Sequence, residues 1–211
     1  MRTLTALCAL ALPLAAQPSL RLVIDEDFRS GRANGVRLQD PGEWTGEGWK
    51  VTSERTQLRY DLGKHYARGV VEAVLRGPLR IEGEDVKRNV VALWNEEAGA
   101  DGNRLTQSFF QLRLQGGGMM LRLTNRAGGR SFEGQTAPLS WDSARWCTVR
   151  GEWNSAGGVN RLWRDGELLK AGEFNAAFPG FRWVFIGKDN YQRFHSNPGA
   201  VYRSLKVWVE E

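Results

Sequence analysis

Alternation with a period of two is the feature that most constrains what this chain of 211 residues can fold into. Ten short segments are rich in Val, Leu and aromatic residues, and most place apolar residues at every second position, as β-strands do. Gly-rich and Asn-rich clusters separate them, and no stretch of a dozen residues has a helical period. The segments are 20–24, 56–62, 69–76, 89–94, 108–115, 119–125, 146–153, 160–164, 183–187 and 202–210.

Near-regular spacing of these segments, without an internal repeat or a linker, predicts an all-β fold. We expect one antiparallel two-sheet β-sandwich of the jelly-roll type. The length is comfortable for a single domain, which we assign to residues 17–211.

The segments 108–115 and 119–125 flank a three-glycine turn and are expected to form a hairpin. Alternation then places Gln111, Arg113 and Arg122 together on one face. The other face of the same two strands carries Phe110, Leu112, Leu121 and Leu123. In the neighbouring segments we expect Trp94 on the polar face and Glu72 pointing outward. The segment 89–94 is apolar on both faces, as in a strand covered on both sides.

The stretch RLWRDGELL holds an Asp-Gly pair between alternating residues. A type I′ turn needs positive φ at both central positions, which Asp tolerates and Gly adopts freely. We therefore interpret Asp165 as a hairpin turn residue and not as a catalytic carboxylate.

The first 16 residues, with Arg2 before a short apolar run that ends in small residues, are typical of a secretory signal peptide. We expect the mature chain to be secreted or periplasmic, without membrane insertion. The chain has two cysteines, and Cys8 leaves with the signal, so Cys147 has no disulfide partner. The net charge of +5 is spread along the chain without a basic run, which excludes a typical nucleic-acid-binding protein.

The last third of the chain has a recognisable order of strands. A Trp-led strand (146–153) is followed by NRLWRDGELL, by the apolar segment FNAAFPGFRWVFIGKDN and by the closing strand GAVYRSLKVWVEE. This order resembles the concanavalin A-like lectin/glucanase superfamily, particularly its laminin G-like jelly rolls, as a secreted bacterial member. The resemblance covers most of residues 20–211. It implies two stacked antiparallel sheets with a concave, often sugar-binding face, and it does not imply catalysis.

Catalytic motifs of that superfamily do not match this sequence. Retaining glycosidases place carboxylates at alternate positions of one strand, as Glu-x-Asp-x-(x)-Glu. The acidic stretches 82–86 and 94–103 are predicted to be loops and not strands. Polysaccharide lyases use a His or Tyr base with an Arg or Gln; the segment 188–195 offers such residues, but the lyase pattern on a neighbouring strand is missing.

The sequence gives little indication of a metal or cofactor site. Two histidines and one remaining cysteine exclude most zinc sites, and Cys147 reads as a small core residue. No cofactor is expected, and a structural calcium ion at the acidic segment 24–28 is the one metal option.

The nine tryptophans are mostly expected to pack in the core or at the rim, Trp146 and Trp153 among them. Trp44 and Trp49 are expected in a loop, where they would be open to sugar stacking.

These observations favour a carbohydrate-binding, lectin-like domain that acts as a monomer and recognises a polysaccharide, with an acidic one as an option. Two alternatives stay open: a polysaccharide lyase or glycoside hydrolase that uses the same cleft, and a protein-binding laminin G-like domain. The expected ligand-binding residues lie on a concave sheet face, with the last two at its rim: Glu72, Trp94, Gln111, Arg113, Arg122, Tyr191 and His195.

Overall fold

The structure is a computed structural model, and it describes residues 19–77, 87–96, 108–115, 117–125, 130–140, 142–174, 178–188 and 196–211. The expected signal peptide lies outside the described residues. In the part described, the chain forms strands and one short 3₁₀ turn, η1 (Phe28–Ser30). No helix in the described ranges is long and apolar enough to span a bilayer.

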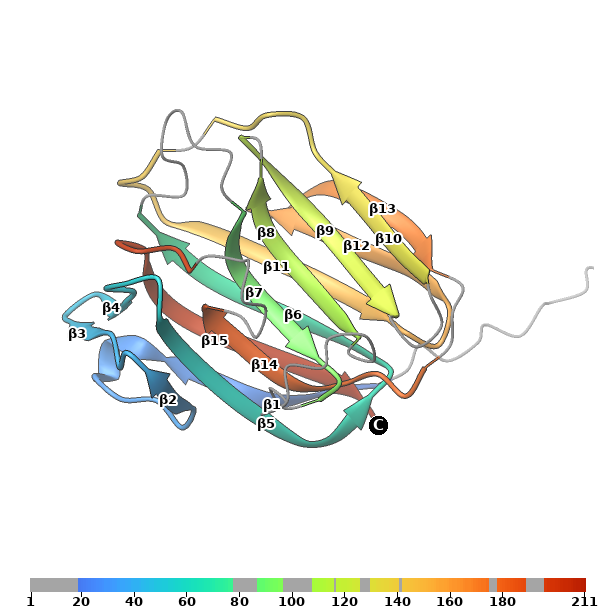
Figure 1. Ribbon diagram of the computed structural model, residues 1–211, viewed down its shortest axis with the longest axis horizontal. Helices are drawn as coiled ribbons and strands as arrows, with labels where there is room; N and C mark the ends of the chain where they lie inside the picture. Colours follow the sequence, from blue (N-terminus) through green and yellow to red (C-terminus); the bar gives the residue numbers. More distant parts are fainter. Residues whose placement is uncertain are drawn as a thin grey trace, which may run out of the picture.

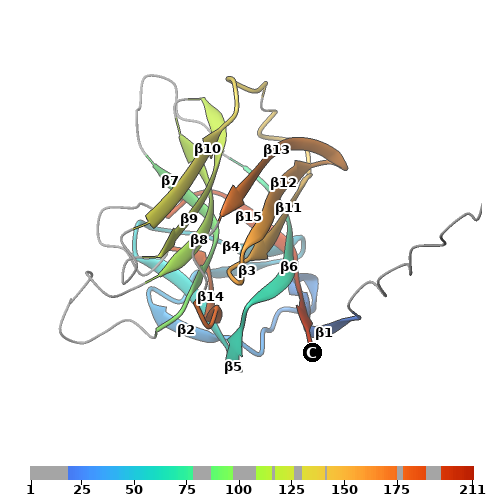
Figure 2. The ribbon, with the colours of Figure 1, turned by 90° about the vertical axis from the view of Figure 1, so that its right-hand side faces the viewer.

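Two antiparallel sheets lie face to face (Figures 1 and 2). Sheet A has the order β13-β12-β11-β6-β15-β4-β3, with β1 also paired to β15. Its strands are β1 (Leu20–Asp27), β3 (Glu43–Thr45), β4 (Gly48–Lys50), β6 (Arg68–Arg76), β11 (Cys147–Asn154), β12 (Gly158–Arg164), β13 (Glu167–Phe174) and β15 (Val201–Glu210).

Sheet B has the order β10-β9-β8-β7-β14-β5-β2. Its strands are β2 (Val36–Gln39), β5 (Thr56–Tyr66), β7 (Arg88–Trp94), β8 (Phe109–Gln115), β9 (Gly118–Asn125), β10 (Arg130–Gln135) and β14 (Phe181–Gly187). The sandwich expected from the sequence is therefore confirmed. All ten predicted segments are strands, and 108–115 pairs with 119–125 as the expected hairpin.

Five strands were not predicted, namely β2, β3, β4, β10 and β13. Four of them, β2, β3, β10 and β13, lie at sheet edges, where polar residues are tolerated and the apolar alternation is weak. The loop predicted around Trp44 and Trp49 is wrong, because these residues lie in the hairpin β3–β4. Trp49 is fully buried and donates from Nε1 to the Pro41 carbonyl at 3.0 Å, so it is a core residue and offers no stacking surface.

The core lies between the sheets and is centred on aromatic rings from both. Trp153 of sheet A packs against Phe110 and Phe181 of sheet B, with ring centroids 6.3 and 6.4 Å away. The Trp153 indole donates to the Tyr66 carbonyl at 3.1 Å, so its one polar atom is satisfied. Trp153 is thus a core residue as predicted, whereas Trp146 is only partly buried and contacts the guanidinium of Arg203 at 3.7 Å.

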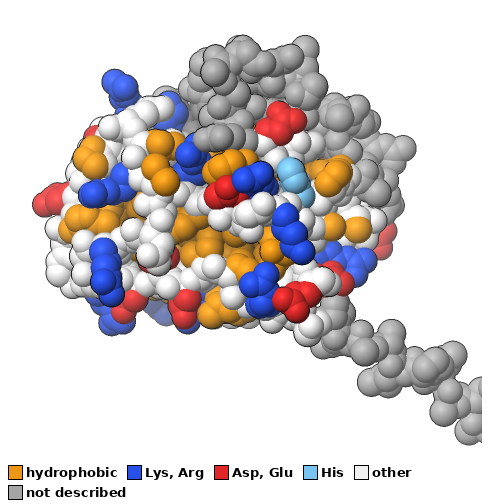
Figure 3. All heavy atoms as spheres, turned by 90° about the horizontal axis from the view of Figure 1, so that it is seen from below, with side chains coloured by type: hydrophobic (Ala, Val, Ile, Leu, Met, Phe, Trp, Pro, Cys, Tyr) orange, Lys and Arg blue, Asp and Glu red, His pale blue; other side chains and the backbone are white. Residues whose placement is uncertain are grey.

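Within the described ranges, the most exposed large hydrophobic residues all lie on edge strands: Leu20 and Leu22 on β1, Val36 on β2 and Leu168 on β13. Figure 3 views the molecule from the side along which β5 and β1 run. Hydrophobic side chains form a band across the middle of this face, with charged side chains around them. Apolar exposure in this fold is therefore concentrated where strands lack a second neighbour.

Asp165 and Gly166 form the turn between β12 and β13, with φ of 52° and 85°. Positive φ at both positions is what a type I′ turn requires. Asp165 also accepts the backbone N–H of Thr148 through Oδ1 at 2.8 Å, which ties the turn to β11. The interpretation as a turn residue is confirmed.

Gly166→Val is expected to lower the free energy of unfolding by about 1 kcal/mol or more, because a β-branched residue resists positive φ. No atom lies within 4 Å of the position that a Cβ would take, so the cost is conformational and not steric. Asp165→Asn is the matched control and should unfold as the wild type does, since Asn tolerates the same φ and keeps the acceptor for Thr148. Urea denaturation measures both, and equal midpoints for all three proteins would contradict the turn assignment.

Tyr202→Phe tests a hydrogen bond that joins the sheets, from the buried Tyr202 hydroxyl on β15 to the Val90 carbonyl on β7 at 2.7 Å. The substitution leaves that carbonyl buried and unpaired, so we expect a loss of about 1–3 kcal/mol of stability. Tyr60→Phe is the control, because the buried Tyr60 hydroxyl has no hydrogen-bond partner among the described residues. An equal effect of both substitutions on thermal or urea unfolding would refute the role of the Tyr202 bond.

Candidate ligand-binding face

The side of sheet B that faces away from the core carries two parallel rows of side chains, and we call it the outer face of sheet B. Register fixes the rows, because directly paired residues of antiparallel strands point to the same side. The first row runs Ser131, Thr124, Phe109, Trp94, Trp183, Asp61. The second runs Glu133, Arg122, Gln111, Ala92, Phe185, Arg59.

An apolar cluster separate from the core occupies the middle of these rows. It consists of Ala92, Trp94, Phe109, Trp183 and Phe185, and none of its members is more than 9% exposed. The rings of Trp94 and Phe109 pack at a centroid distance of 4.8 Å. Strand β7 is therefore apolar on both faces because it contributes to both clusters, as the sequence predicted, and all seven of its residues are buried.

Arginine side chains lie over the rings of this cluster. The guanidinium carbon of Arg122 is 5.0 Å from the centroid of Phe109. At the other end, the guanidinium carbons of Arg59 and Arg182 are 4.8 and 5.1 Å from Trp183. These distances are within the range of cation–π attraction, so the outer face of sheet B combines flat rings with positive charge.

Hydrogen bonds and ion pairs orient these cations. Arg122 Nε is 2.5 Å from the Glu133 carboxylate, across the β9–β10 pair. Arg113 is almost fully buried, and it contacts the Gln111 side-chain oxygen at 3.4 Å and the Met120 sulfur at 2.9 Å.

At the far end of the first row, Arg182 binds both carboxylate oxygens of Asp61 at 2.7 Å. The hydrogen bonds from Arg182 hold the pKa of Asp61 below its ordinary value. Asp61 is thus an ionised partner of Arg182 and is not poised to exchange a proton near neutral pH.

The charge of this face is unbalanced among the described residues. Four arginines (Arg59, Arg113, Arg122 and Arg182) stand against two carboxylates (Asp61 and Glu133). The two carboxylates lie on β5 and β10, five strands apart in the sheet order, which corresponds to about 24 Å. Paired carboxylates of glycosidases lie about 5–9.5 Å apart, so these two do not form such a pair.

Four of the seven residues that the sequence singled out share this face, namely Trp94, Gln111, Arg113 and Arg122. They point away from Phe110, Leu112, Leu121 and Leu123, which are fully buried in the core. The alternation of the β8–β9 hairpin predicted this arrangement. Tyr191 and His195 lie outside the described residues.

Glu72 does not belong to this face, and its expected place there is wrong. It lies on β6 in sheet A, where it points outward as expected but pairs with Arg150 and Lys206. Its carboxylate is 3.5 Å from the Arg150 guanidinium. The sequence shows which way a side chain points from its own strand, but not which of the two sheets that strand joins.

Arg59, Trp183 and Phe185 were not predicted as site residues. The sequence does hold a signal for them, because apolar and polar residues also alternate in QLRYDL and FRWVFIG. Only the pairing of β14 with both β5 and β7 brings these residues together with Trp94, and that pairing joins segments about 90 residues or more apart.

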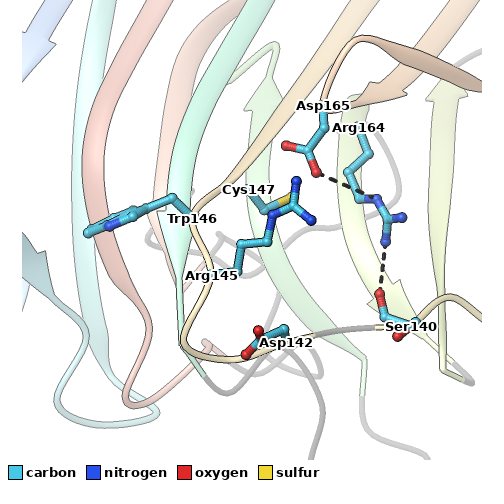
Figure 4. A pocket seen from close by; sticks show the side chains of 7 residues that line it. All are labelled: Ser140, Asp142, Arg145, Trp146, Cys147, Arg164 and Asp165. Carbon is cyan, nitrogen blue, oxygen red and sulfur yellow. Dashed lines mark hydrogen bonds and ion pairs between the residues drawn. The ribbon is translucent and has the colours of Figure 1, made fainter.

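A pocket of about 210 Å³ lies elsewhere, at the end of β11 and β12 (Figure 4). It is lined by Ser140, Asp142, Arg145, Trp146, Cys147, Arg164 and Asp165. Arg164 donates to the Ser140 carbonyl at 3.1 Å, and Asp165 is the turn residue described above. Burial raises the pKa of the Cys147 thiol to about 12, so the thiol stays protonated and unreactive at neutral pH.

In the described ranges, no three His, Cys, Asp or Glu side chains gather closely enough to hold a metal ion. The acidic segment 24–28 uses its carboxylates within the protein. Asp25 pairs with Lys206 at 3.3 Å, Glu26 accepts the Asn34 N–H at 2.7 Å, and Asp27 binds Arg29 at 2.6 Å.

No family model matches this sequence, and no curated protein matches it. Solved structures do match the fold. The CBM40 of the Ruminococcus gnavus IT-sialidase, bound to α2,3-sialyllactose, is 16% identical with a TM-score of 0.56, over 89% of this chain and 92% of that chain.

Domain 4 of a GH43 extracellular arabinanase from Geobacillus stearothermophilus, in complex with arabinotriose, is 12% identical with a TM-score of 0.58, over 90% of this chain and 93% of that one. Domains LG4-5 of the mouse laminin α1 chain are 16% identical with a TM-score of 0.54, over 81% of this chain and 44% of that one. At these identities the likeness is one of fold. The expected two-sheet jelly roll is thereby confirmed as the fold of this chain, and solved carbohydrate-binding and laminin G domains share it.

Proposed function

We propose that this chain is a secreted carbohydrate-binding domain that recognises an acidic polysaccharide on the outer face of sheet B. The observation that carries the proposal is the pair of rows in which Arg122, Arg59 and Arg182 lie over aromatic rings. Sugars present polar edges, and guanidinium groups held in place over aromatic rings suit them; the rings of Phe109 and Trp94 are themselves at most 1% exposed.

The charge supports an acidic sugar over a neutral one. Four arginines against two carboxylates leave a positive excess on the outer face of sheet B. On the outer face of sheet A, charges of opposite sign pair across strands instead: Asp25, Lys206, Glu72 and Arg150 follow one another in register, and Glu152 pairs with Arg161. Because guanidinium groups bind carboxylates and sulfates in a bidentate way, the excess favours uronates or sulfated sugars.

Two of the structural neighbours were solved with sugars, the R. gnavus CBM40 with sialyllactose and the arabinanase domain with arabinotriose. They support a glycan as the ligand class and leave its identity open. We favour binding over catalysis because the two carboxylates of the face are far too distant from each other to act as a glycosidase pair.

Isothermal titration against polygalacturonate, alginate, hyaluronan, heparin, xylan and β-glucan tests this function. We expect saturable binding to at least one acidic polymer and weaker binding to the neutral ones. Reducing-end and unsaturated-product assays run on the same mixtures. Release of either product would establish the hydrolase or lyase alternative, and no binding to any polymer would reject the glycan proposal.

Arg122→Ala should weaken binding of the best acidic polymer by about 1–3 kcal/mol, the range for a hydrogen bond to a charged group. The loss should shrink as salt screens the interaction. Arg161→Ala is the matched control, because Arg161 forms a similar cross-strand pair with Glu152 at 2.9 Å on the outer face of sheet A. Equal affinities of the two variants would move the site away from the outer face of sheet B.

Glu133→Gln should raise the affinity for an acidic polymer about two- to fivefold, since an exposed ion pair contributes up to about 1 kcal/mol. The Glu133 carboxylate competes with the ligand for Arg122 and repels its charge. Glu152→Gln, on the other sheet, is the control and should leave the affinity unchanged. A fall in affinity with Glu133→Gln, measured by the same titration, would show that Glu133 itself binds the ligand.

A further inference from the structure

In the first row of the outer face of sheet B, two buried polar atoms have no hydrogen-bond partner among the described residues: the indole Nε1 of Trp94 and the hydroxyl of Thr124. Their side chains are 1% and 5% exposed. Buried polar atoms are paired in the great majority of cases, because an unpaired one forfeits its hydrogen bonds to water. Two such atoms in one row therefore need an explanation.

The register places Trp94 and Thr124 on either side of Phe109. Trp94 on β7 pairs with Phe109 on β8, and Phe109 pairs with Thr124 on β9. Since adjacent strands are about 4.8 Å apart, the two side chains start roughly 10 Å apart, with the Phe109 ring between them. That separation suits a single sugar ring, with a polar group at each edge and the aromatic ring beneath it.

The chemistry of the two groups is complementary. An indole N–H only donates, so it requires an oxygen acceptor, whereas a hydroxyl both donates and accepts. The ring oxygen and the hydroxyls of a sugar offer both roles. A purely apolar ligand would leave both groups unpaired.

The Phe109 ring is fully buried, and Arg122 is one of the side chains that lie over it. The Arg122 guanidinium lies over Phe109 at 5.0 Å, and the Arg122 side chain is 18% exposed. A sugar can therefore pack against Phe109 only if Arg122 turns away from the ring, as it would toward an acidic group of the ligand.

We propose that Trp94 and Thr124 are the specificity-determining residues of the outer face of sheet B. The Trp94 N–H donates to an oxygen at one edge of an acidic sugar, the Thr124 hydroxyl bonds a hydroxyl at the other edge, and Phe109 packs against the ring. The inference rests on the proposed function. It adds that uncharged hydrogen bonds from Trp94 and Thr124 select among acidic sugars, which the arginines attract by charge.

Trp94→Phe and Thr124→Val remove the polar atoms and keep most of the packing. Each should weaken the binding of trigalacturonate, or of heparin tetrasaccharide if only sulfated polymers bind, about three- to tenfold. The free energy of unfolding should not fall with Thr124→Val, because an unpaired hydroxyl contributes no bond. Tyr60→Phe is the control: Tyr60 also has an unpaired buried hydroxyl, but on the core side of the same sheet, paired with Val184.

The indole ¹H–¹⁵N resonance of Trp94, assigned by its absence in Trp94→Phe, should move on titration with the same oligosaccharide. Wild-type affinity in both variants, together with weakened binding in Arg122→Ala, would overturn this inference and leave the proposed function standing. An equal loss in Tyr60→Phe would also overturn it. A failure of the wild type to bind any polymer in the panel would remove both proposals.

Discussion

The contact of Trp153 with the opposite sheet is the interaction on which the rest of the architecture depends. Its indole lies between the sheets against Phe110 and Phe181, and it is anchored by the Tyr66 carbonyl. Gly69 makes room for it, since a Cβ there would lie 2.4 Å from the indole carbons. With no disulfide available among the described residues, side-chain packing of this kind holds the sheets together, along with hydrogen bonds such as the one from Tyr202 to Val90.

The same packing determines what the outer face of sheet B can present. Because side chains alternate along a strand, each core residue of β8 and β9 obliges its neighbour to point outward. Phe110 and Leu112 in the core therefore place Gln111 and Arg113 outside. The outer rows form a second, smaller apolar cluster with arginines over it, so one stretch of sequence supplies both the core and the candidate site.

The sequence predicted the part of this arrangement that depends on local alternation. The ten apolar strands, the Asp165–Gly166 turn and the common face of Gln111, Arg113 and Arg122 all follow from period and turn chemistry. It could not predict Glu72's sheet or the approach of Arg59 to Trp183, because both depend on long-range strand order. The β3–β4 hairpin was missed for another reason: strands of three residues are too short to show a period.

Mapping the bound ligand by NMR tests the central claim most directly. A ¹⁵N-labelled chain is titrated with the acidic oligosaccharide that binds best, and amide and indole shifts are followed residue by residue. The account predicts that the largest shifts cluster on β7, β8 and β9 and at Trp94, while β6, β11 and β12 change little. Shifts confined to sheet A, or to the pocket around Ser140, Arg145 and Asp165, would contradict it.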